Sequence, residues 1–169
     1  MGLPFKGPSS LNIIDISVSS FQKLITLVDE LHRESSRAEK SSSEVSKATV
    51  GWHIAHSYLV IIKSCENLLS NTNRPSKNRK WLQQEVFFLL RKIPRNKIKA
   101  PEFVVPIDYS EEEIQRLYDQ AMSLLLLIKQ DRDGYLSHPF LGPIKPQRVP
   151  LFLRIHTAHH LQIIREIIK

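Results

Sequence analysis

The chain of 169 residues contains a single cysteine, Cys65. One cysteine excludes an intrachain disulfide and any zinc or iron–sulfur site built from several thiolates of the same chain. It also favours a reducing, cytoplasmic setting. No feature near Cys65 in the sequence lowers a thiol pKa, so we expect a small core residue rather than a reactive thiol.

Glycine is also scarce, and the five present are too few for a glycine-rich phosphate-binding loop. No stretch approaches the roughly 18 uninterrupted apolar residues of a transmembrane helix, and the N-terminus lacks the pattern of a secretion signal. We therefore expect a soluble, cytoplasmic protein without a membrane partner. Its length fits one domain over residues 1–169, with residues 1–12 as a flexible N-terminal segment.

Acidic residues are outnumbered by basic ones, 17 against 24, which gives a net charge of +7. A solvated basic surface is the simpler interpretation, and nucleic acid is an unlikely partner. The alternative is a surface that binds an acidic partner or nucleic acid. Much of the excess lies in one basic segment, which contains Arg74, Lys77, Arg79, Lys80, Arg91, Lys92, Arg95, Lys97 and Lys99.

Apolar residues at steps of three and four predict four long helices and one short one. The long helices are expected over residues 13–34, 44–70, 110–131 and 150–169. Ser110 and Glu113 have the spacing of a capping box, and Pro150 suits a first helical turn. Four such helices without a convincing strand predict an all-α four-helix bundle. The connection over residues 71–109 is long, and it carries the short helix around residues 81–93.

Three histidines, His156, His159 and His160, interrupt the apolar run of the last predicted helix. At about 100° per residue, His156 lies at the centre of the apolar stripe and His160 about 40° away, one turn later. His159 lies at the edge of the stripe. A buried imidazole without a partner is unfavourable, so this pair needs hydrogen-bond partners or a metal ion. The i, i+4 spacing allows two ring nitrogens to converge on one ion.

The second long helix adds His53 and His56. Measured from Ala55, the stripe centre lies near about 20°, His56 near about 100° and His53 near about 160°. We therefore expect His56 to reach the interior and His53 to face outward, with His53 as the alternative ligand from this helix. Three neutral imidazoles leave open positions on a divalent ion, as in catalytic sites. Core histidines that bond to polar neighbours are the other interpretation.

Two segments carry a family resemblance. A histidine in the second helix, within "WHIAHSYL", and an H-x-x-x-H in the last, within "HTAHHLQI", resemble the DinB/YfiT-like superfamily of four-helix-bundle proteins. Residues 138–164 are similar to a bacterial branch whose function is largely unassigned. The resemblance implies a metal triad of His56, His156 and His160 with a divalent ion, zinc or nickel. The chain departs from many relatives at Leu161, where they carry a basic residue.

A divalent ion held by three histidines lowers the pKa of a bound thiol or water. The resemblance implies similar chemistry, because characterised relatives include thiol transferases and a thiol-dependent isomerase acting with mycothiol or bacillithiol. We expect a metal-dependent transferase or hydrolase, with transfer of a low-molecular-weight thiol to an electrophilic small-molecule substrate favoured. His159 and His138 are the candidate catalytic residues. The alternative is a non-catalytic binding module with a structural or vestigial metal.

Other polar residues are expected to have structural roles. His32 is predicted to end the first helix, and Asp131, Asp133 and Glu166 are expected at the surface or at helix ends. We also expect that the chain can form a homodimer, because relatives often associate through helix faces.

Overall fold

The computed structural model describes residues 11–71, 79–95, 99–130 and 134–169, which are mostly helical with one small two-stranded sheet. Of the predicted flexible segment, residues 11 and 12 belong to the first helix, and the others lie outside the described residues. The elements in chain order are α1 (Leu11–Arg33), η1 (Ser35–Arg37), α2 (Val50–Ser70), α3 (Trp81–Leu90), η2 (Glu102–Val104), α4 (Glu111–Gln130), β1 (Leu136–His138), β2 (Gly142–Ile144), η3 (Pro146–Arg148) and α5 (Val149–Ile167).

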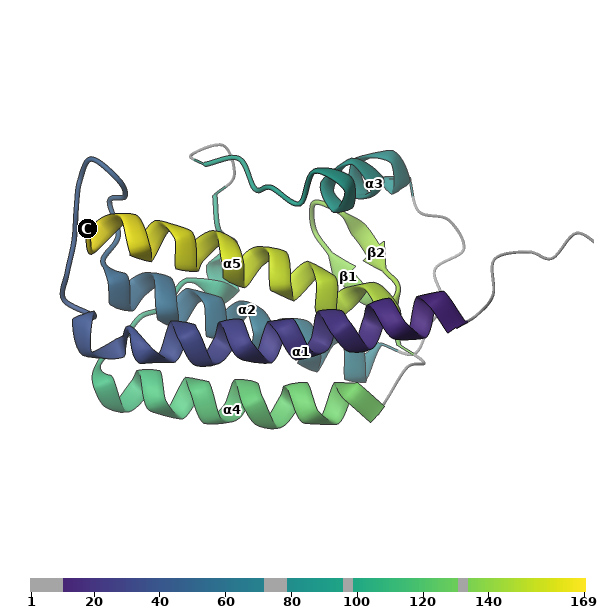
Figure 1. Ribbon diagram of the computed structural model, residues 1–169, viewed down its shortest axis with the longest axis horizontal. Coiled ribbons are helices and arrows are strands. Elements are labelled where there is room, and N and C mark those ends of the chain that lie inside the picture. The colour runs from purple at the N-terminus through teal and green to yellow at the C-terminus, as the bar shows by residue number, and fades with distance from the viewer. Residues whose placement is uncertain (1–10, 72–78, 96–98, 131–133) are drawn as a thin grey trace, which may run out of the picture.

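The four long helices lie side by side, and α3 and the sheet lie beside them at one end (Figure 1). Helix α1 contacts α5 and α4, and helix α2 contacts the same two helices, so α2 and α1 each have two long neighbours. Their apolar stripes share one core, whose fully buried members include Leu24, Val28, Ile61, Leu125 and Leu153. No helix among the described residues has the length and apolarity needed to cross a membrane.

Helix α2 begins at Val50, six residues later than the sequence predicts. The side chain of Thr49 caps it by accepting a hydrogen bond from the Trp52 amide, as N-cap threonines do. The amides of Val50 and Gly51, which no helical carbonyl satisfies, donate to the carbonyls of Lys40 and Ala38. Residues 44–49 therefore form a loop over the start of α2 instead of its first turns.

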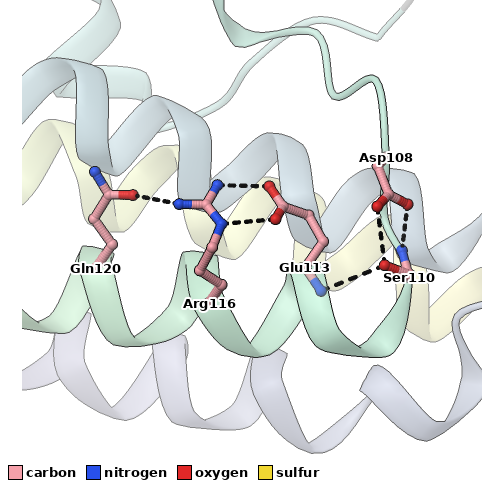
Figure 2. A network of polar contacts seen from close by, with 5 residues as sticks. All are labelled: Asp108, Ser110, Glu113, Arg116 and Gln120. Atoms are coloured by element: carbon pink, nitrogen blue, oxygen red, sulfur yellow. Dashed lines mark hydrogen bonds and ion pairs between the residues drawn. The ribbon is translucent and has the colours of Figure 1, made fainter.

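The start of α4 confirms the predicted cap only in part (Figure 2). The Glu113 amide donates to the Ser110 hydroxyl at 3.4 Å, as in a capping box. The reciprocal bond is replaced, because the Glu113 carboxylate pairs with Arg116 and Asp108 accepts both the amide and the hydroxyl of Ser110. Arg116 also bonds Gln120, so the exposed side of the first turns carries a continuous polar network.

The sheet corrects the prediction of a chain without a convincing strand. Strand β1 pairs antiparallel with β2, with His138 opposite Gly142. Gly142 has a φ of 71°, which favours glycine, and the Gln84 amide of α3 donates to the carbonyls of Leu141 and Pro143. These contacts from a distant helix stabilise a hairpin too short and too rich in Gly and Pro to show a strand pattern.

Gly51 gives a test of this packing. A Cβ at this position would lie 2.8 Å from a ring carbon of Tyr109, 3.0 Å from the Ala38 Cβ and 3.2 Å from the Ala38 carbonyl oxygen. Helix propensity alone predicts that Gly51→Ala stabilises the protein by about 1 kcal/mol. We expect the opposite, a loss of about 1–3 kcal/mol in the free energy of unfolding, because the helix start is overpacked.

Urea denaturation measures this difference. Ser123→Ala on the exposed side of α4 is the control and is expected to change the free energy of unfolding by less than about 0.5 kcal/mol. A Gly51→Ala variant as stable as the unaltered chain would contradict the close approach of Tyr109 and Ala38.

Candidate metal centre

Three histidines from two helices meet beside the core. His56 comes from α2, and His156 and His160 come from successive turns of α5. One ring nitrogen of each lies within 4.8 Å of the other two. His56 and His160 are buried, whereas His156 keeps some exposure to a cavity beside it. The structure thus brings together the three histidines that the facing angles select.

The ring of His56 is fixed on both sides. Its Nδ1 lies 2.7 Å from the carbonyl oxygen of Val104, and the indole of Trp52 stacks on it at 4.8 Å. Because a carbonyl only accepts, Nδ1 carries the proton and Nε2 keeps its lone pair. This is the arrangement of metal-binding histidines, whose second nitrogen donates to an oxygen of the protein.

The prediction that His53 faces outward is wrong. His53 is 4% exposed, and its Nδ1 lies 3.0 Å from Nδ1 of His160. Its Nε2 lies 2.9 Å from the hydroxyl of Ser46, which belongs to the loop before α2. Helix α2 is covered by α4, α5 and this loop. The side of α2 that the helical wheel assigns to solvent is therefore buried as well.

The histidines of the cluster are held neutral. Burial lowers the pKa of His156 and His160 well below its usual value, and the neighbouring imidazoles add to the effect. Burial is also the largest cause for His53, whose pKa falls to about 4. Nδ1 of His156 is buried and has no hydrogen-bond partner among the described residues. Neutral rings with free lone pairs are the form in which histidine binds a metal.

A cavity of about 730 Å³ lies over the cluster, within the range of small-molecule sites. His159 and His138, the two candidate catalytic residues, both line it. The ring of His159 lies 5.1 Å from that of His160, and burial lowers its pKa. Nδ1 of His138 accepts the amides of Phe140 and Leu141, so this ring shapes the hairpin turn as well as the cavity.

Other residues singled out in the sequence lie apart from the cluster. His32 is in the last turn of α1 and stacks on Tyr118 at 4.0 Å, which confirms it as a helix-end residue. Cys65 is buried, and burial raises the pKa of its thiol to about 12. Glu166 accepts two hydrogen bonds from Arg95, and this pairing lowers its pKa to about 2. Asp131 and Asp133 lie outside the described residues.

Sequence reasoning missed several residues around the cluster. Ser46 and the Val104 carbonyl bond the histidines, yet no motif marks either of them. In the sequence nothing distinguishes Arg95 from the other members of the basic segment, and the six members that the structure describes are all exposed. Comparison with protein-family models, with curated proteins and with solved structures finds no match to this chain.

His138 gives a test of the buried imidazoles in protein freed of metal by a chelator. Burial lowers its pKa from 6.5 to about 4, with Lys80 adding to the effect. The unfolded chain therefore takes up the proton first, and the free energy of unfolding falls as the pH is lowered through the window from 6.5 to about 4. For a side chain that keeps some exposure we expect His138 to contribute about 2–3 kcal/mol to this loss.

The variant His138→Asn keeps an acceptor for the turn amides and removes the titration. Urea denaturation between about pH 4 and pH 7 is expected to show a smaller loss of stability in this variant than in the unaltered chain. Parallel pH profiles of the two proteins would contradict the lowered pKa.

Proposed function

We propose that the chain is a metal-dependent transferase or hydrolase with the four-helix-bundle fold of the DinB/YfiT-like superfamily. His56, His156 and His160 are the ligands of its divalent ion, zinc or nickel. The observation that carries the proposal is the convergence of their three ring nitrogens within 4.8 Å beside a cavity of about 730 Å³. Three neutral imidazoles leave coordination positions open toward that cavity, as catalytic sites require.

The hydrogen bonds around the cluster favour ligands over ordinary core histidines. If Nδ1 of His160 donates to His53, then His53 carries its own proton on Nε2 and donates to Ser46. This assignment satisfies each bond and leaves Nε2 of His160 with a lone pair. His56 reaches the same state through Val104. The carbonyl of Val104 therefore fixes the tautomer that a metal needs at His56, and the hydrogen bonds of His160 are compatible with the same tautomer.

The cavity supports a reaction on a small molecule. A bound divalent ion would lower the pKa of a coordinated thiol or water and make a nucleophile available at neutral pH. The aromatic side chains that line the cavity would pack against an electrophile beside the histidines. His159 lines the same space and is placed to take or give a proton. Transfer of a low-molecular-weight thiol is the favoured reaction, and hydrolysis is the second.

A binding module is the second candidate function, and the surface around α3 favours it. Trp81, Leu82 and Leu89 are 62%, 61% and 81% exposed, although they are large and apolar. Exposed Arg79 and Arg91 flank this helix. Large apolar side chains exposed together on one helix are typical of contact sites, and the basic residues beside them suit an acidic partner.

The metal assignment predicts metal content. Protein purified without an affinity tag and supplied with zinc or nickel is expected to hold about one ion per chain by elemental analysis. His156→Ala and His160→Ala are each expected to lose the ion and keep the helical circular dichroism spectrum. The control is His32→Ala, which removes a histidine on α1 outside the cluster. Undiminished metal in both α5 variants would exclude the assignment.

The size of the loss in metal affinity distinguishes the roles of the two histidines of α2. His56→Ala is expected to abolish metal binding, because it removes a ligand. His53→Ala is expected to weaken binding by about 10–100-fold, because it removes only the hydrogen-bond partner of His160. Competition with a chromophoric chelator measures both affinities. The reverse order would make His53 the ligand from this helix.

A further inference from the structure

The cavity is extended along α5. Phe152, His156, His160 and Ile163 all line it and follow one another at about one turn each. With a rise of about 1.5 Å per residue, Phe152 and Ile163 are about 16 Å apart along the helix axis. The histidine cluster therefore lies between two ends of the cavity, and these ends differ in chemistry.

One end is aromatic. The Phe152 ring lies 4.9 Å from that of His138 and 6.1 Å from that of Phe87, and Phe140 lies 6.1 Å from His138. These rings come from α3, from the β1–β2 hairpin and from α5, so three separate parts of the chain build this wall. Aromatic walls of this kind bind apolar and ring-bearing groups.

The two charged side chains of α2 that line the cavity have opposite signs and cancel. Lys63 and Glu66 form an ion pair at 2.9 Å, and they belong to the half of α2 that leads toward the hairpin. The contact of this half with the hairpin is seen at Asn67, whose side-chain oxygen accepts a hydrogen bond from the Ser137 amide of β1. The residues of α2 that line the aromatic side of the cavity thus add no net charge to it.

The other end is cationic. Arg95 lines the cavity and is tied by two hydrogen bonds to Glu166 in the last turns of α5. Its positive charge contributes to the lowered pKa of His53 and His159, so the guanidinium lies near that side of the cluster. Lys99, four residues further on, also lines the cavity and forms no ion pair with any residue that the structure describes.

We propose that the cavity binds an amphipathic anion, with an apolar, ring-bearing group at the aromatic end and an oxyanion, carboxylate or phosphate, at Lys99 and Arg95. Since Arg95 shares its charge with Glu166, Lys99 supplies the uncompensated charge. The part of the ligand between its two ends lies over the three histidines. That this part is the one that reacts rests on the proposed function, whereas the binding preference does not.

Calorimetric titration of the zinc-loaded full chain tests the preference with four probes long enough to join the two ends: 8-phenyloctanoate, its neutral amide, octanoate, and 7-phenylheptyl phosphate. We expect 8-phenyloctanoate to bind roughly tenfold or more tightly than either the amide or octanoate, about the effect of one charge-assisted hydrogen bond or of one buried ring. The phosphate probe identifies the oxyanion, because the tighter of the two anionic ring compounds matches the natural head group. Equal affinity for phenyloctanoate and its amide would overturn the proposal.

Two variants and a control locate the groups. Lys99→Gln is expected to remove most of the preference for phenyloctanoate over its amide, and Phe87→Ala is expected to weaken both to a similar extent. Lys92→Gln is the control, since Lys92 is an exposed cation of the same segment that does not line the cavity. A preference that survives Lys99→Gln and disappears when zinc is removed would place the oxyanion on the metal and overturn the assignment to Lys99.

The same titrations separate this inference from the proposed function. A chain that binds no metal, yet keeps its preference for the anionic ring compound, would retain the ligand class and lose the metal-dependent reaction. A chain that binds one zinc ion without any such preference would keep the metal site and lose the ligand class.

Discussion

The histidine rings between α2 and α5 lie in a largely apolar contact, where their nitrogens need hydrogen-bond partners. The positions of the loop before α2 and of η2 depend on this constraint. An unsatisfied buried polar group costs about 1–3 kcal/mol. Four rings without any partner between α2 and α5 would therefore strongly lower the free energy of unfolding. His53 bonds His160 and Ser46, and His56 bonds the Val104 carbonyl, whereas Nδ1 of His156 has no partner among the described residues. The loop before α2 and the turn η2 are held against the helices by these bonds.

The helices and the three-histidine cluster were predictable because both follow from local periodicity. The facing angle of His156 depends only on residues within two turns, such as Phe152 and Ile163, and these are buried as expected. Helix ends were predictable where the signal is a proline or an acidic first turn, as for α5 and α4. The start of α2 was not predictable, because the amides of Val50 and Gly51 are satisfied by carbonyls 10 and 13 residues earlier in the chain.

His53 shows the limit of a helical wheel. The wheel assigns one apolar stripe to each helix and treats the opposite side as exposed. Helix α2 is buried on nearly all sides, since α4 and α5 cover two of them and the loop containing Ser46 covers the third. The hairpin and Arg95 were missed for a related reason, because their partners Gln84 and Glu166 are 57–59 and 71 residues away in sequence.

The bond between His56 and Val104 has a consequence for how chains of this kind diverge. Its acceptor is a main-chain carbonyl, which every amino acid possesses, so substitution at position 104 leaves the bond in place and a motif cannot record it. The length and path of the connection between α3 and α4 decide whether a carbonyl arrives there at all. Two chains with identical histidines and helices can therefore differ in chemistry through an insertion in that connection alone.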